Sequence, residues 1–153
     1  MSTILSPTRG GEKSYPNQDY AIKLAKERGA KLVFLYVSDV QFLNNWASPV
    51  LVDVMAELEE MGEFLLAMAQ ERASKSGVEV ETLVRSGVFS DVLEDLIPKY
   101  EINTLVLGSS DEDTGLTTNE FLLKLSTTLH DDFGVEVLLV REGELLETVP
   151  SAS

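Results

Sequence analysis

The sequence predicts an α/β fold, built as a parallel sheet with helices on both of its faces. Two runs, KLVFLYV at residues 31–37, continuously apolar after its lysine, and TLVL at residues 104–107, have the pattern of strands that are covered on both sides. Segments with helical spacing separate these runs from three further strand-like segments, so strands and helices alternate along the chain. That alternation favours a parallel sheet whose crossover helices pack on its two faces.

Five strands are expected, at residues 3–6, 31–37, 78–85, 104–107 and 135–140. The segment VEVETLVR at 78–85 alternates apolar and polar residues, which indicates an edge strand with one wetter face. Four helices are expected between the strands, at residues 18–28, 48–76, 91–97 and 117–131.

Residue types that begin and end helices support these bounds. Pro16 suits the first turn of the first helix, where its missing N–H costs nothing, and Gly29 suits the position after its end. Ser48 before a proline is a good start for the second helix, with Gly77 after it. Ser90 is expected to cap the short third helix.

The second helix is long, roughly 40 Å at 1.5 Å per residue. It carries one apolar stripe with alternating spacings of three and four, formed by Leu51, Val54, Leu58, Met61, Leu65 and Met68. Because strands flank the helix on both sides, we expect this stripe to face the sheet. The same spacing is typical of a coiled-coil seam, so a helix that binds a partner is the alternative.

The charge of the chain excludes two classes of partner. There are 12 basic and 26 acidic residues, a net charge of −14. Residues 1–31 hold six basic and three acidic side chains, a net +3, whereas the remainder holds six basic and 23 acidic, a net −17. Because nucleic acid and anionic membranes are bound through cationic contacts, we expect neither as a partner.

Length and composition indicate one domain in a cytoplasmic protein. With 153 residues, 44% of them apolar, the chain is long enough for a substantial core. It has no cysteine, which excludes disulfides and thiolate metal sites, and no apolar run approaches the ~18 residues of a membrane span. No secretory signal is visible. Residues 142–153 are expected to form a polar, frayed C-terminal tail.

The predicted site lies where two loops meet beyond the carboxyl ends of the strands. In such sheets ligands bind where the strand order reverses, and a first strand beside the fourth brings together the loops at 7–14 and 108–115. The candidate cleft residues are Pro7, Thr8, Arg9, Gly10, Val37, Gly108, Ser109, Ser110, Asp111 and Asp113. The first loop, in SPTRGGEKSYPN, fails as a phosphate-binding P-loop, because Pro7 and Glu12 stand where that motif needs glycine.

Several segments resemble the universal stress protein family. They are ILSP and AIKLAKERGAKLVFLYV near the start, SGVFSDVLEDLI in the middle, and INTLVLGSS leading to VEVLLVR. The resemblance implies a universal stress protein domain over residues 1–141, with a three-layer, Rossmann-like (adenine nucleotide alpha hydrolase-like) fold and five parallel strands in the order 3-2-1-4-5. It also implies a homodimer through antiparallel pairing of the fifth strands, at Val135, Val137, Leu138, Leu139 and Val140. An unpaired apolar edge invites such a partner.

Members of this family that bind ATP share G-x2-G-x9-G-[S/T] after the fourth strand and an aspartate after the first. Glycines there let backbone N–H groups approach the phosphates. This chain keeps Gly108, but Asp111 and Phe121 stand at the other two glycine positions, Leu122 follows, and Arg9 corresponds to the aspartate. We therefore expect no ATP binding of the family type and no cofactor, with ATP or AMP as the alternative.

The acidic run DEDTG in the second loop supports that expectation. It places three carboxylates where a triphosphate would lie, and at an effective dielectric of ~20 one charge pair 4 Å apart is worth roughly 4 kcal/mol. We hypothesise that Arg9 and Lys13 face Asp111 and Asp113 and close the cleft. The alternative is that these side chains point into water.

No metal site or catalytic group is expected. DEDTG lacks the later ligands of a calcium loop, and Ser109 has no evident base to activate its hydroxyl. His130, the only histidine, is expected on the surface of the fourth helix. We predict a dimeric, non-enzymatic stress-response module that acts through an unknown protein partner or small ligand. The alternative is a nucleotide-binding protein with slow ATPase activity.

Overall fold

The order of helices and strands confirms the predicted alternation. The computed structural model describes residues 2–9, 12–38, 48–109 and 119–150. The strands are β1 (Thr3–Pro7), β2 (Lys31–Ser38), β3 (Val80–Ser86), β4 (Thr104–Gly108), β5 (Glu136–Arg141) and β6 (Glu144–Val149). The helices are α1 (Tyr15–Arg28), α2 (Ser48–Lys75), α3 (Phe89–Lys99) and α4 (Asn119–Phe133), with the short 3-10 helix η1 (Glu12–Ser14) before α1.

The strands form one sheet in the order β3-β2-β1-β4-β5-β6. The first five strands are parallel, and β6 runs antiparallel to β5. Leu5 of β1 pairs with Val33 of β2 on one side and with Leu105 of β4 on the other, which puts β1 inside the sheet. The order 3-2-1-4-5 is therefore present, and a sixth strand extends it.

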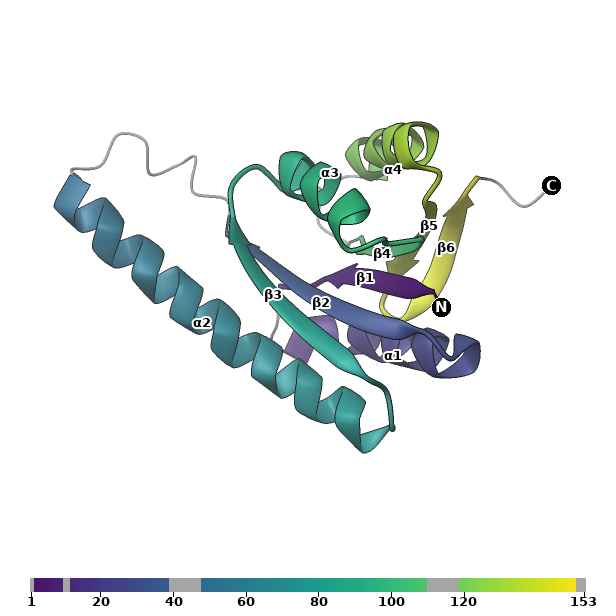
Figure 1. The fold of residues 1–153 in the computed structure, drawn as a ribbon, viewed down its shortest axis with the longest axis horizontal. Helices are drawn as coiled ribbons and strands as arrows, with labels where there is room; N and C mark the ends of the chain where they lie inside the picture. Colours follow the sequence, from purple (N-terminus) through teal and green to yellow (C-terminus); the bar gives the residue numbers. More distant parts are fainter. Residues whose placement is uncertain (1, 10–11, 39–47, 110–118, 151–153) are drawn as a thin grey trace.

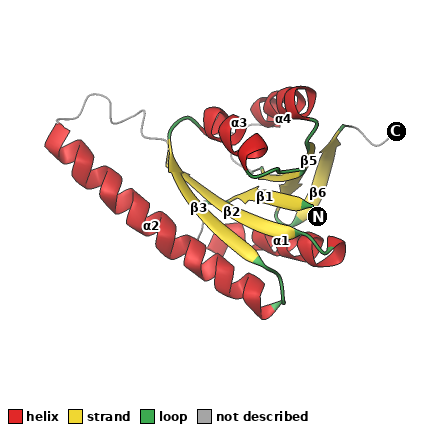
Figure 2. Cartoon of the chain, viewed as in Figure 1, coloured by secondary structure: helices red, strands yellow, loops and turns green. Residues whose placement is uncertain are grey.

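Helices cover both faces of the sheet, with α1 and α2 on one side and α3 and α4 on the other (Figures 1 and 2). Each face has its own cluster of buried side chains. Successive residues of a strand point to opposite faces, and the fully buried neighbours Ile4 and Leu5 of β1 belong to different clusters. Burial on both faces explains why the central strands are continuously apolar.

Helix ends follow the expected chemistry at α1 and differ at α3. Pro16 lies in the first turn of α1, and Gly29 ends the helix in the left-handed conformation at φ 61°. The first turn begins at Tyr15, three residues before the predicted start. The third helix begins at Phe89, so Ser90 lies inside α3 instead of capping it.

The C-terminal segment corrects the predicted frayed tail, because residues 144–149 form β6. A two-residue turn at Glu142 and Gly143, with φ values of 50° and 82°, joins β5 to β6. Positive φ at both positions matches the right-handed twist of a tight hairpin. The sheet therefore continues beyond the fifth strand.

This hairpin also corrects the predicted dimer edge. Pairing with β4 and β6 covers β5 on both sides, and its apolar residues are buried. This strand is therefore not an exposed edge of the sheet. It contains four of the predicted edge residues, Val137, Leu138, Leu139 and Val140, and the fifth, Val135, immediately precedes it. The homodimer itself stays a prediction.

The side of α2 that faces the sheet differs from the predicted stripe. Among the residues of α2 whose burial the structure describes, the buried ones are Gly62, Leu66, Ala69 and Ala73. Met61 and Met68 of the predicted stripe are 46% and 38% exposed, so the prediction is wrong at these positions. Small side chains let the helix lie close to the strands, which the larger residues of the stripe would prevent.

Candidate functional site

The predicted cleft lies at the carboxyl ends of β1 and β4, two neighbouring strands at the centre of the sheet. The structure describes six of its predicted residues: Pro7, Thr8, Arg9, Val37, Gly108 and Ser109. The other four, Gly10, Ser110, Asp111 and Asp113, lie outside the described residues. The described residues show which side chains fill the space between the two strand ends.

Asn17, in the first turn of α1, fills the space beside Gly108. A Cβ atom added to Gly108 would lie 2.8 Å from the side-chain nitrogen of Asn17. The side-chain oxygen of Asn17 accepts a hydrogen bond from the backbone N–H of Gly143 at 2.9 Å. Asn17 therefore bridges the end of β4 and the turn between β5 and β6, at the position where a glycine-rich loop would approach phosphates.

Gln18 closes the neighbouring space beside β1. Its side chain is 1% exposed, and Nε2 donates a hydrogen bond to Oγ1 of Thr8 at 2.8 Å. Its Oε1 accepts a hydrogen bond from Nη1 of Arg72 on α2 at 2.7 Å. Arg72 also pairs with Asp19 and lies 4.0 Å from the centre of the Tyr15 ring. This network holds α1, α2 and the residue after β1 together.

Arg141 occupies the β5 side of the cleft. Its Nη2 donates a hydrogen bond to Oγ of Ser109 at 3.3 Å. The backbone N–H of Ser109 donates to the carbonyl of Val140 at 2.7 Å, and Ser109 is buried. A guanidinium therefore lies next to the residue that follows Gly108, where it contributes positive charge.

Two further predicted residues contribute less to the cleft. Arg9 is exposed, and Val37 is half-buried against the core on the α3 and α4 side. The pairing of Arg9 and Lys13 with the acidic loop stays a prediction, because Asp111 and Asp113 lie outside the described residues.

His130 and Ser109 lie at opposite ends of the sheet. The ring nitrogen Nδ1 of His130 is 3.0 Å from the carbonyl oxygen of Val135, which immediately precedes β5. Ser109 follows the carboxyl end of β4, which runs parallel to β5. His130 is thus separated from the Ser109 hydroxyl by the length of the strands, too far to activate it as a nucleophile.

Sequence reasoning missed three side chains that lie at the cleft among the described residues: Asn17, Gln18 and Arg141. A signal for each is present in the sequence. Asn17 and Gln18 are neutral polar residues in the first turn of the helix after β1, and Arg141 directly follows the buried run of β5. Side chains in these places lie beside the carboxyl ends of the strands, where ligands of such sheets bind.

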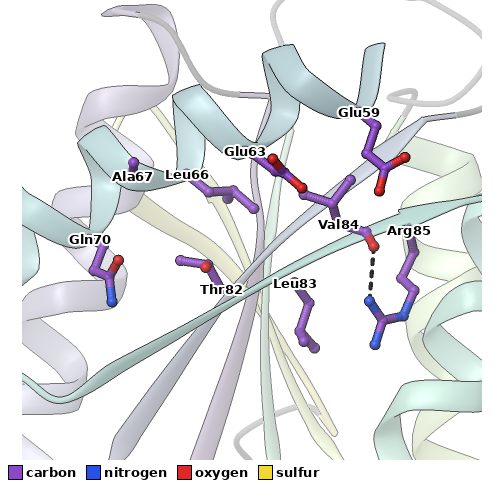
Figure 3. Close-up of a pocket in the computed structure, with 9 residues that line it drawn as sticks. All are labelled: Glu59, Glu63, Leu66, Ala67, Gln70, Thr82, Leu83, Val84 and Arg85. Atoms are coloured by element: carbon purple, nitrogen blue, oxygen red, sulfur yellow. Dashed lines mark hydrogen bonds between the residues drawn. The ribbon is translucent and has the colours of Figure 1, made fainter. Parts of the chain in front are cut away.

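A separate hollow of about 410 Å³ lies between α2 and β3 (Figure 3). In the sheet, β2 lies between β3 and β1, the nearer of the two strands that carry the cleft. Glu59 and Glu63 extend toward it from α2, while Arg85 donates a hydrogen bond from Nη1 to the carbonyl of Val84 at 2.9 Å. Arg85 Nη2 also donates to the Tyr100 hydroxyl at 3.4 Å. The hollow is thus lined by two carboxylates and by the guanidinium of Arg85, which already donates hydrogen bonds to Val84 and Tyr100.

Two groups outside the cleft have raised pKa values. Burial raises the pKa of Tyr20, with the charges of Glu136 and Glu27 adding to the shift and Arg28 opposing it. The hydrogen bond to Glu81, at 2.7 Å, raises the pKa of Lys31 at the start of β2.

Arg28 connects the amino ends of two strands. Its Nη1 lies 3.0 Å from Oε1 of Glu136 at the start of β5, and donates to Oγ1 of Thr104 at the start of β4 at 3.2 Å. This ionic contact is at the end of the sheet opposite the cleft, so we assign it a structural role.

No helix within residues 2–9, 12–38, 48–109 and 119–150 is both long and apolar enough to cross a membrane. Nor do three histidine or carboxylate side chains come together as a metal-binding group within those ranges.

Comparisons with known proteins agree with this architecture. The sequence matches the universal stress protein family over residues 1–124. A relative, universal stress protein MJ0531 of Methanocaldococcus jannaschii, is 28% identical over 114 residues, which are 74% of this chain and 66% of that protein. The match therefore spans just under two thirds of the relative's length.

Solved structures show the same fold. Universal stress protein UspA from Lactobacillus plantarum is similar with a TM-score of 0.74 at 20% identity, covering 92% of this chain and 97% of that one. A universal stress protein in complex with cAMP is similar with a TM-score of 0.62 at 24% identity, covering 91% and 96% of the two chains. With the family match over most of its length, the chain belongs to the universal stress protein family.

Proposed function

We propose that this chain is a non-enzymatic regulatory module of the universal stress protein family. It does not bind ATP through the loop after β4, which is rich in glycine in the members that bind ATP. The observation that carries the proposal is the position of the Asn17 amide, 2.8 Å from where a Cβ of Gly108 would lie. A phosphate that approached the backbone of Gly108 on this side would have to displace that amide, because the amide occupies this space. Its displacement would also break the hydrogen bond to Gly143.

Two further contacts support the same proposal. Gln18 donates a hydrogen bond to Thr8 after β1, and Arg141 donates one to Ser109 after β4. Polar groups on both sides of the cleft are therefore hydrogen-bonded within the protein. The replacement of two motif glycines by Asp111 and Phe121 points the same way. The module would then act in the cytoplasm, through contacts with other proteins.

The alternative is a nucleotide-binding protein with altered contacts and slow ATPase activity. One of the similar structures is a complex with cAMP. In this chain the observation that favours an anionic ligand is the guanidinium of Arg141 beside Ser109, because a cation in this position would attract a phosphate. For a nucleotide to bind there, Arg141 would have to exchange Ser109 for the ligand.

The test measures the thermal midpoint of the purified chain with millimolar Mg-ATP, AMP or cAMP. Binding at a hundredfold excess over Kd would stabilise the native state by about 2.7 kcal/mol, which is several degrees for a chain of this size. We expect no such shift, and no nucleotide absorbance released when the protein is denatured. A shift of several degrees with any of the three, or a co-purifying nucleotide, would overturn the proposal.

A second arm tests whether Asn17 closes the cleft. In Asn17→Ala the amide beside Gly108 is removed, and Lys23→Ala, at an exposed position of the same helix, is the control. We expect ATP to bind more tightly to Asn17→Ala than to the control. If the two variants behave alike, the amide is not what excludes the phosphates.

The homodimer implied by the family resemblance would, on this proposal, form only when the β5 edge is free. A second copy can pair with β5 only where β6 now pairs, so the two compete for the same backbone groups. We therefore propose that dimerisation through β5 requires β6 to leave the sheet.

A further inference from the structure

The long helix α2 does not pack on the sheet through its most apolar side. A Cβ added to Gly62 would lie 2.6 Å from Cδ1 of Tyr36 on β2, so the helix backbone approaches the sheet closely at this point. Leu66, Ala69 and Ala73 continue the buried side toward the C-terminus. Because Gly62 and these residues face the strands, the rotation of α2 about its axis is fixed.

A second, larger apolar side of α2 is only partly covered by the residues that the structure describes. We call it the α2 seam, and it consists of Val54, Leu58, Met61, Phe64, Leu65 and Met68. Met61, Phe64 and Met68 are 46%, 65% and 38% exposed, and the other three are partly buried. Figure 1 shows that the N-terminal half of α2 extends past the edge of the sheet, and none of the strands and helices that the structure describes covers it there.

The spacing of the seam matches a helical partner. Val54, Leu58, Met61, Leu65 and Met68 repeat at intervals of four, three, four and three, which is the pattern of the a and d positions of a coiled coil. Phe64 widens the stripe on its outer side. Methionine and phenylalanine give such a surface large, adaptable side chains, which suit the binding of an amphipathic helix.

The charge around the seam decides the nature of the partner. Residues 48–67 hold five acidic side chains and no basic one, a net charge of −5. Glu57 and Glu60 lie one helical turn before Met61 and Phe64, on the open side of the stripe. A second copy of this chain would bring the same acidic residues against them, and like charges across an interface are unfavourable. A cationic partner would instead be attracted.

We propose that the α2 seam docks a cationic amphipathic helix of another protein. The partner helix supplies apolar residues at intervals of three and four, with lysine or arginine opposite Glu57 and Glu60. The proposed function includes contacts with an unidentified protein, and this inference names the chemistry of that protein. It rests on the proposed function only in assuming that such a protein partner exists. Nucleotide binding in the cleft would overturn the proposed function and leave the seam proposal untouched.

The probe is a dye-labelled helical peptide with leucine at a and d and lysine at the remaining positions of each heptad. Its binding to the full chain is measured by fluorescence anisotropy near physiological salt. A peptide with glutamate in place of lysine is the control for charge. We expect micromolar binding of the lysine peptide and no binding of the glutamate peptide.

Two variants locate the binding surface. In Met61→Ser with Phe64→Ser, we expect at least tenfold weaker binding of the lysine peptide. Leu145→Ser with Leu146→Ser on β6 is the matched control, because these residues are 47% and 48% exposed, and we expect it to bind like the unchanged chain. Circular dichroism checks that both variants remain folded.

A charge-reversal variant tests the electrostatic part of the proposal without changing the apolar residues of the α2 seam. In Glu57→Lys with Glu60→Lys, we expect weaker binding of the lysine peptide and new binding of the glutamate peptide. The proposal is overturned if the unchanged chain binds neither peptide, or if the seam and β6 variants lose affinity equally. It is also overturned if the seam variant abolishes a concentration-dependent dimer of the unchanged chain, because the occupant would then be a second copy.

Discussion

The side chain of Asn17 and the backbone of Gly143 meet across 126 positions of the sequence, with Oδ1 of Asn17 accepting the N–H of Gly143 at 2.9 Å. A Cβ at Gly143 would lie 3.1 Å from the carbonyl oxygen of Pro16, so the β5–β6 turn lies directly against the first turn of α1. On its other side the Asn17 amide contacts Gly108. One side chain thus connects the start of α1, the end of β4 and the hairpin that extends the sheet.

Asn17→Ala should therefore loosen the hairpin selectively. We expect a loss of about 1 kcal/mol in the free energy of unfolding, because one hydrogen bond to a partly buried N–H is removed. The hydrogen exchange of the β6 amides should quicken more than that of β2. Urea unfolding and exchange measurements check both effects, with Lys23→Ala as control. Equal exchange in β6 of the two variants would contradict this role of Asn17.

Arg72 is expected to matter through Gln18. In Arg72→Ala the buried Oε1 of Gln18 loses its donor, and the contact with the Tyr15 ring is lost as well. We expect a destabilisation of about 1–3 kcal/mol in urea unfolding, because an acceptor is left unsatisfied in the interior. Arg72→Lys should recover only part of it, since a lysine lacks the fork that reaches Gln18 and Asp19 together. Full recovery by lysine would show that charge alone is what counts.

The architecture could be predicted from the sequence because burial on both faces leaves an unmistakable apolar pattern. Residues 31–37 and 104–107 read as central strands, and β2 and β4 lie inside the sheet. The strand β6 could not be predicted, because ELLETV combines two leucines with two glutamates and pairs along one side only. Its position depends on the turn at Glu142 and Gly143, which lies against the first turn of α1. Such a contact leaves no periodic pattern of apolar residues in the sequence.

The orientation of α2 and the contents of the cleft were harder to predict for a different reason. Hydrophobic periodicity identifies the largest apolar stripe, yet the helix packs through Gly62, Ala69 and Ala73, whose small size is what permits close approach. Likewise, in the sequence Asn17 and Gln18 have the character of ordinary surface residues of a helix. Only the order of the strands in the sheet places them beside the carboxyl ends of β1 and β4. Both depend on how segments distant in sequence meet.

Gly62→Ala tests the close approach of α2 to the sheet. The added methyl group would lie 2.6 Å from the Tyr36 ring, so the helix or the ring must shift. We expect a loss of about 1–3 kcal/mol despite the better helix propensity of alanine. Ala67→Leu, which adds volume at an exposed position of the same helix, is the control and should change stability by less than about 0.5 kcal/mol. Equal stability of Gly62→Ala and the unchanged chain would rule out this packing.

The raised pKa values of Tyr20 and Lys31 predict a loss of stability in alkaline solution. Because both groups hold their protons more tightly in the folded chain, their contribution is complete below the unfolded pKa values and is lost as the pH rises through the folded ones. We expect the free energy of unfolding to fall above about pH 10. In Tyr20→Phe with Lys31→Gln this decline should be shallower when urea unfolding is followed across that range. An unchanged slope in the double variant would assign the decline to other groups.

Deletion of residues 142–153 tests the competition for the β5 edge. Without β6, the outward backbone N–H and C=O groups of Leu138 and its neighbours in β5 lose their antiparallel partners, and an apolar strand with such an edge pairs with another chain. We expect the unchanged chain to sediment as a monomer and the deletion variant as a dimer in analytical ultracentrifugation. Deletion of residues 150–153 alone leaves β6 complete and should remain monomeric. If the unchanged chain is already a dimer that neither deletion alters, the second copy pairs through another surface, and β6 is a permanent part of the sheet.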